Sequence, residues 1–264
     1  MTSVQDSFTA IGSRARMTKL PARSWGRFEV NVLRDDRGEY FDFVVDRATS
    51  LVVLDVAPAD RHLVVQASSS HDAYRATRPP ATYLCGHDER AWFVAAIPED
   101  AGAETVRAAK DALKPAEVWD AIREFDVPAD EWDERSTAAF VRQGEWFFLP
   151  RYDLRVDEQR VLHDEPISRG SRSKPHACEC LFRIDGVEVF TCEAFPNGLT
   201  ERQVRGLRDV AEHRWERRVR DAKVFVRGRV THPDHAPIRL SVWHEVVMNT
   251  ETRAAAMANV AFFD

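Results

Sequence analysis

The sequence predicts an α+β fold, in which antiparallel sheets built from β-hairpins pack with about three to four helices. Three observations lead to this class. Short runs with alternating apolar side chains fill residues 25–98, an Asp-Gly pair joins two alternating runs within 174–198, and apolar residues recur at helical spacing in 106–125 and 204–219. Alternation with a period of two is typical of half-buried strands, and a spacing of three or four residues is typical of helices that pack on a core.

The composition indicates a globular protein. The chain has 264 residues, a net charge of −6 and 44% hydrophobic residues. No apolar run approaches the 18 or so residues that cross a bilayer, and no apolar secretion signal precedes the first strands. Four cysteines in this length do not make a disulfide framework, so we expect a cytoplasmic location. Only five of the 37 basic residues are lysines, a bias that suggests a GC-rich bacterial genome.

The first half of the chain divides into an arm, a meander and two helices. Residues 1–24 lack periodicity and are expected to form a flexible N-terminal arm. Residues 25–128 read as three β-hairpins followed by two helices, the second beginning near Pro115, a residue suited to a first helical turn. The polar stretch 129–137 is the expected linker.

The second half, residues 138–264, reads as a strand-rich α+β unit with one long amphipathic helix. Residues 138–150 are expected to form one strand, and a hairpin follows around Asp185-Gly186. Thr200 and Gln203 have the spacing of a capping box at the start of the long helix. The strands expected at 224–230 and 238–248 enclose a polar loop, residues 231–237.

The expected Asp185-Gly186 hairpin fixes a register, because Asp-Gly favours the two-residue type I′ turn. In that register His176, Cys178 and Cys180 share a face, whereas Cys192 lies on the opposite one. Zinc needs four ligands that converge on one point, so we expect the cysteines to be buried core residues, reduced and without a metal.

The strongest candidate site is the loop that contains His232, Asp234 and His235. Two imidazoles and a carboxylate within four residues have the chemistry to bind a divalent metal, and the alternative is an ordinary polar turn. A fourth ligand is expected from another hairpin tip, with His87 or Asp88 as the first choice. That composite site requires the two tips to lie at the same end of the molecule.

Two further histidine-containing segments favour structural roles. Cys85 and His87 lie in a charged tip, where a thiol and an imidazole so close in sequence are not expected to act as nucleophile and base. His244 shares a strand face with apolar residues, so it is expected to be buried with a local hydrogen bond.

An arginine-rich segment is the candidate surface for a partner. Its members are Arg202, Arg205, Arg208, Arg217 and Arg218. Acidic residues are interleaved with them and the chain is acidic as a whole, so nucleic acid is not the favoured partner. The alternative is a solvated helix face without a ligand.

No Walker loop, dinucleotide fingerprint or nucleophile elbow occurs in the sequence, and the sequence leaves open whether the protein is an enzyme. The leading hypothesis is therefore a non-catalytic module that binds a macromolecular partner. The alternative is a metal-dependent hydrolase or nuclease that uses the His232/Asp234/His235 loop, with a divalent metal as its cofactor.

Overall fold

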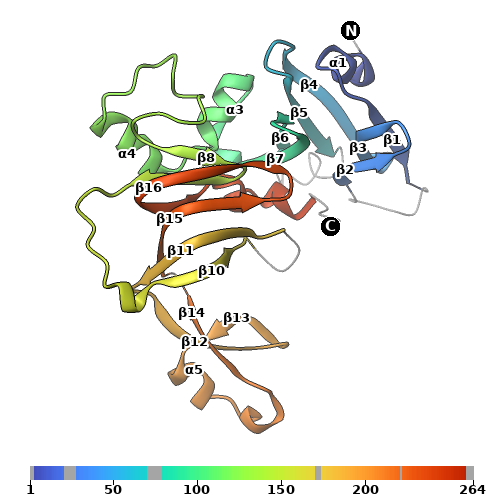
Figure 1. The fold of residues 1–264 in the computed structure, drawn as a ribbon. Coiled ribbons are helices and arrows are strands. Elements are labelled where there is room, and N and C mark those ends of the chain that lie inside the picture. The colour runs from blue at the N-terminus through green and yellow to red at the C-terminus, as the bar shows by residue number, and fades with distance from the viewer. Residues whose placement is uncertain (1–2, 21–27, 70–78, 170–173, 221, 260–264) are drawn as a thin grey trace.

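Strands dominate the protein, and four sheets with four α-helices in the described part of the chain confirm the α+β class. The structure is a computed structural model, and it describes residues 3–20, 28–69, 79–169, 174–220 and 222–259 (Figure 1). Within these ranges, all strand pairs but one are antiparallel. The exception joins β1 (Ala15–Lys19) to β3 (Gly38–Val45).

The N-terminal segment is ordered where the structure describes it, so the expectation of a flexible arm is wrong for those residues. Helix α1 (Val4–Ala10) begins with a capping box between Ser3 and Asp6, and β1 adds a third strand to β3 and β2 (Phe28–Asp35). Phe8 is fully buried, with its ring centroid 4.8 Å from that of Phe41. Two large buried side chains, Phe8 and Ile11, hold the segment against the core, and two such residues in a short sequence produce no periodic pattern.

The three expected hairpins of the meander are confirmed. They are β2–β3, β4 (Thr49–Ala57) with β5 (His62–Ser69), and β6 (Ala81–Asp88) with β7 (Ala91–Ile97). The last four strands form one sheet in sequence order. The three-stranded and four-stranded sheets face each other across an aromatic core, where Phe28 and Tyr83 have centroids 5.6 Å apart.

Both helices expected after the meander are present, as α3 (Val106–Ala112) and α4 (Ala116–Glu124). Thr105 caps the first through a hydrogen bond from the Ala108 N–H, and Pro115 precedes the second. The expected linker, 129–137, makes ion pairs with the first half, from Asp133 to Lys114 and from Arg135 to Asp88. The division of the chain into two halves stays a prediction.

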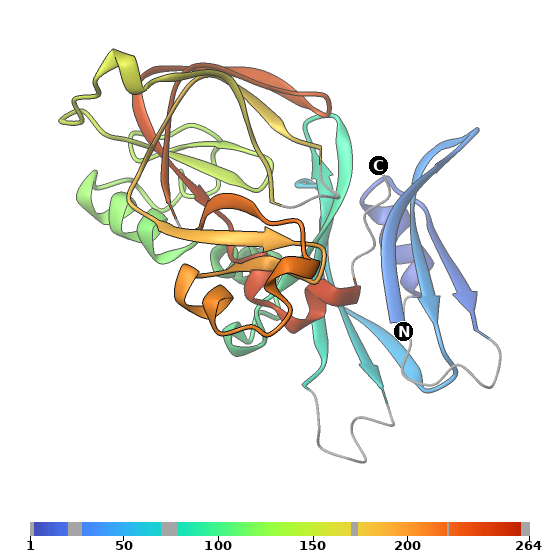
Figure 2. The same cartoon turned by 90° about the horizontal axis from the view of Figure 1, so that it is seen from below.

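The second half is built on a six-stranded sheet with the order β10-β11-β15-β16-β9-β8. Residues 138–150 form a hairpin and not one strand, because Gly144 adopts a φ of 58° between β8 (Val141–Gln143) and β9 (Trp146–Pro150). The other members are β10 (Leu162–Ile167), β11 (His176–Ile184), β15 (Lys223–His232) and β16 (His235–Met248). Figures 1 and 2 show this sheet beside the N-terminal sheets.

The hairpin expected around Asp185-Gly186 does not form. Both residues have the predicted positive φ, 60° and 92°, yet β11 pairs with β10 and β15, whereas β12 (Val187–Cys192) pairs with β13 (Phe195–Leu199) and β14 (Glu216–Arg220). The turn therefore joins two sheets. The smaller sheet lies below the six-stranded one in Figure 1.

A second correction concerns the cysteines of β11. Its pairing with β15 is irregular between Cys178 and Cys180, and the two thiols pack in different hydrophobic clusters, Cys178 with Leu181 and Cys180 with Phe182. Cys178 is fully buried, whereas Cys180 is half-buried, 3.9 Å from His163 Nδ1. Across this shift β11 advances two residues and β15 three, so an extra residue in β15 disturbs the regular ladder that the sequence register assumed.

The prediction of a long amphipathic helix after Thr200 is also wrong. The capping box at Thr200 and Gln203 is present, but α5 ends after one short turn (Glu201–Arg205) at Gly206. The chain then turns, with the Trp215 Nε1–H donating to the Val210 carbonyl at 2.9 Å, and continues as β14. Glycine is a poor helix former, so the helix ends at Gly206 although apolar residues continue at helical spacing.

The C-terminal segment returns to the first half. Thr250 Oγ1 donates to the Ala112 carbonyl at 2.6 Å, and the Tyr83 hydroxyl donates to the Ala256 carbonyl at 3.2 Å. Across the described ranges, no helix combines the length and apolarity needed to cross a membrane.

Candidate metal centre

The hairpin β15–β16 places two histidines opposite each other at its tip. His232 and His235 are register partners, and only Pro233 and Asp234 separate them. Pro-Asp is favourable turn chemistry, so the expected seven-residue loop is a tight two-residue turn. The Asp234 N–H donates to His232 Nδ1 at 3.2 Å, which fixes the His232 ring against the turn.

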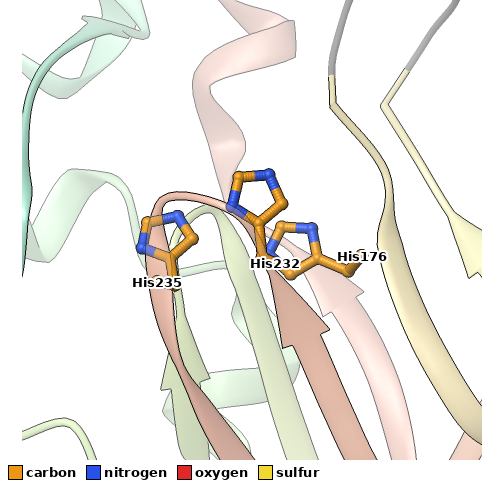
Figure 3. Close-up of side chains that lie close together, drawn as sticks. All are labelled: His176, His232 and His235. Atoms are coloured by element: carbon orange, nitrogen blue, oxygen red, sulfur yellow. The ribbon is translucent and has the colours of Figure 1, made fainter.

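Strand β11 adds a third histidine to this pair. The pairing of Ala177 with Thr231 puts His176 beside His232 across the sheet. Residues opposite each other in paired strands point to the same face. The His176 ring therefore stacks on His232, with centroids 4.2 Å apart, and His235 lies 4.7 Å from His232 and 5.7 Å from His176 (Figure 3).

His176 is buried without a hydrogen-bond partner. Its side chain is 1% exposed, and neither ring nitrogen has a partner in the described structure. Burial, together with smaller effects of the neighbouring His232 and His235, lowers the pKa of His176 to about 3. The imidazole is therefore neutral at pH 7, with a lone pair available on one nitrogen.

His235 is the second histidine that lacks a hydrogen bond. Its Nδ1 is buried without a partner. Burial and His232 lower its pKa, although Asp88, Glu145 and Asp234 act in the opposite direction. Two neutral imidazoles with unused nitrogens thus lie together, beside a third that accepts a hydrogen bond only from the turn.

The donor set fits a transition metal, with a small adjustment of the rings. One nitrogen from each histidine lies within 4.8 Å of the others. Tetrahedral ligands at 2.0–2.1 Å from zinc stand about 3.3 Å apart, so the rings must rotate towards each other to bind. His232 could bind the metal through Nε2; its Nδ1 would then carry the proton and could no longer accept the hydrogen bond from the Asp234 N–H. Alternatively, Nδ1 would bind the metal in place of accepting that hydrogen bond.

The other residues expected at this site divide into near and remote ones. Asp234 belongs to the turn and pairs with Lys174 at 3.3 Å. The two hairpin tips do meet, because the Ala236 N–H donates to Glu89, the residue that follows Asp88. His87 packs on Trp92, with centroids 5.0 Å apart, and its strand position directs it to the face opposite Asp88. The structure therefore brings Asp88 near the histidines and leaves His87 away from them.

Asp88 is held by two arginines. Arg142 contacts it through both terminal nitrogens, at 3.1 and 3.3 Å, and Arg135 pairs with it and with Glu89. Burial raises the pKa of Asp88, but Arg142 and Arg135 outweigh burial and hold it below its usual value. The carboxylate is therefore ionised at pH 7.

His232 and His235 line a cleft between the N-terminal sheets and the six-stranded sheet, and His176 is buried behind them. The cavity measures about 990 Å³ and is lined by residues of both signs of charge. On its wall Arg169 pairs with Glu251 at 2.5 Å and lies 3.9 Å from Glu145. Glu251 is 2% exposed, and burial raises its pKa against the opposing effect of Arg169. A cavity of this size can hold a small ligand beside the histidines.

The arginines expected to bind a partner lie elsewhere, on α5, the turn after it and β14. All five are exposed: Arg202, Arg205, Arg208, Arg217 and Arg218. Three have carboxylate partners, namely Arg205 with Glu201, Arg217 with Glu188 and Arg218 with Glu216. Binding of a partner here stays a prediction.

The remaining sequence expectations concern structural residues. Cys85 is fully buried, and burial raises the pKa of its thiol, so it is not an activated nucleophile. His244 is 6% exposed, and its Nδ1 lies 2.8 Å from the Val242 carbonyl, as expected.

His176 is the site residue that sequence reasoning left out. The sequence groups His176 with the cysteines of its own strand, because the pairing of β11 with β15 joins residues far apart in the chain. No family model, curated protein or solved structure matches the chain.

Proposed function

We propose that His176, His232 and His235 bind a first-row transition metal, and that the protein is a metal-dependent hydrolase with its centre in the cleft. The observation that carries the proposal is the state of His176. A buried imidazole without a hydrogen bond costs stability, and such a residue is expected to have a ligand. Two more histidines within reach supply the rest of a three-nitrogen site.

The ligand type favours zinc, copper, nickel, cobalt or iron over magnesium and calcium. Imidazole nitrogens suit those transition metals, whereas magnesium and calcium prefer oxygen ligands. Neutral histidines bind metal without first losing a proton at pH 7, which supports affinity near neutral pH.

The cleft supports hydrolysis over a purely structural metal. Structural zinc sites are closed by four protein ligands, whereas three ligands leave a position for water. A metal lowers the pKa of such a water towards 7. Glu145 and Asp234 lie close enough to His235 to influence its pKa, so carboxylates are at hand to accept a proton.

Metal binding is tested by titration of protein stripped with a chelator. Zinc competition and cobalt absorption spectra should show one ion per chain, and His232→Ala should weaken binding at least about 100-fold. His163→Ala is the matched control, because His163 lies on β10, outside the cluster. A wild-type protein without stoichiometric binding, or an equal loss in both variants, would contradict the metal site.

Hydrolysis is tested separately, with phosphodiester and ester substrates that release a chromophore. Turnover should require added metal and disappear in His232→Ala while persisting in His163→Ala. If the metal binds but no class of hydrolysable substrate turns over, the metal site stands and the hydrolase proposal fails.

A further inference from the structure

The tip of β6–β7 is linked to the histidine cluster through a chain of short contacts. Asp88 is 13% exposed in its side chain and grips Arg142 through both carboxylate oxygens. Arg142 Nη1 also donates to the Gly144 carbonyl at 3.1 Å. The Arg142 guanidinium therefore links the Asp88 carboxylate to the β8–β9 turn.

The β8–β9 turn in turn rests against His235. A Cβ at Gly144 would lie 2.7 Å from His235 Nε2, so only a glycine allows this approach. The positive φ of Gly144, 58°, independently favours glycine at this position. Any movement of Arg142 that shifts the Gly144 peptide therefore shifts the wall on which the His235 ring lies.

The backbone next to His235 is held from both sides. The Ala236 N–H donates to Glu89, and the Ala236 carbonyl accepts from Gln143 Nε2 at 2.6 Å. Arg135 pairs with both Glu89 and Asp88 and so links the two carboxylates of the tip. Three hairpin tips, β6–β7, β8–β9 and β15–β16, converge on this histidine.

We infer that Asp88 is a positioning residue for His235, so that the sheet β4–β7 completes a metal centre whose ligands all belong to the second half of the chain. The inference rests on the proposed metal site. Groups that orient metal ligands from outside the coordination shell commonly change affinity 10–100-fold when they are replaced. Asp88 acts through Arg142 and Gly144, without itself contacting the metal.

The test compares Asp88→Asn with Asp133→Asn. Both changes remove a partly buried carboxylate that two cations hold in the same cleft, but Asp133 pairs with Lys110 and Lys114. The zinc affinity of Asp88→Asn should fall 10–100-fold, whereas that of Asp133→Asn should stay within about threefold of wild type. Arg142→Lys, which keeps the charge but not the two-nitrogen grip, should resemble Asp88→Asn.

A second readout uses the chelator-treated protein without metal. Asp88→Asn should move the His235 ring resonances in NMR spectra and leave those of His244 in place, whereas Asp133→Asn should move neither. Equal affinity and unmoved His235 resonances in Asp88→Asn and Arg142→Lys would overturn the inference while wild-type metal binding stands. Moved resonances in a protein that binds no metal would sink the proposed function and keep the positioning role.

Discussion

Replacing His176 with leucine should stabilise the protein when no metal is bound. The two side chains are similar in volume, and volume-conserving changes are well tolerated in a core. The change removes two buried nitrogens without partners, each of which costs about 1–3 kcal/mol, and loses a ring stack worth about 0.5–1.5 kcal/mol. These values leave a net gain of about 0.5–5.5 kcal/mol at pH 7, and we expect the lower part of that range, about 1–2 kcal/mol.

The gain should grow in acid. Unfolded His176 takes up a proton near pH 6.5, whereas the native state resists it until about 3, so unfolding binds a proton in that window. The stability of the wild type therefore falls as the pH drops through the window. From pH 6.5 to pH 5 the loss is about 2 kcal/mol, at about 1.4 kcal/mol per pH unit, and His176→Leu should be free of it.

The assay is urea unfolding of both proteins with a chelator, at pH 7 and pH 5. Zinc at 100 times its dissociation constant should then reverse the order at pH 7, because it adds about 2.7 kcal/mol to the wild type and nothing to the variant. A variant less stable than wild type by the same amount at both pH values would refute the reasoning, since His176 would then have partners in solution.

Three further outcomes follow from single residues. Thr200→Ala should remove the cap of α5 and cost about 1 kcal/mol, measured as faster amide exchange in residues 201–205; unchanged exchange would contradict the capping box. Cys180 should react with a thiol reagent in the native state, whereas Cys178, fully buried with its pKa raised to about 12 by burial, should wait for unfolding; equal rates would contradict the packing of the two thiols in different clusters. Gly144→Ala should cost about 1–3 kcal/mol in thermal unfolding and weaken zinc binding as well, and an unaffected zinc affinity would disprove its contact with His235.

Local signals in the sequence predicted local structure correctly. The positive φ of Asp185 and Gly186, the capping box at Thr200 and the three hairpins of the meander all depend on neighbouring residues. The errors arose where distant residues decide the outcome. Whether β12 pairs with β11 or with β14 depends on competing strands, and no turn residue encodes that choice.

The site shows the same division. His232 and His235 were predicted together because the turn joins them, and Asp88 was predicted as a neighbour because both tips are polar. His176 was assigned to its own strand, since alternation reports which residues share a face and not which strand lies alongside. The pairing of Ala177 with Thr231 brings His176 to the two imidazoles that the turn already joins.

The strands β11 and β15 are neighbours in the sheet, and Ile184 at the end of one is the register partner of Lys223 at the start of the other. The β12–β13–β14 sheet and α5 are therefore an insertion, between residues 184 and 223, into what would otherwise be a β11–β15 hairpin. A two-residue Asn-Gly turn could close the same pair of strands. His176 and His232 lie at the opposite ends of those strands, so the insertion could be excised, or exchanged for another domain, without disturbing the histidines.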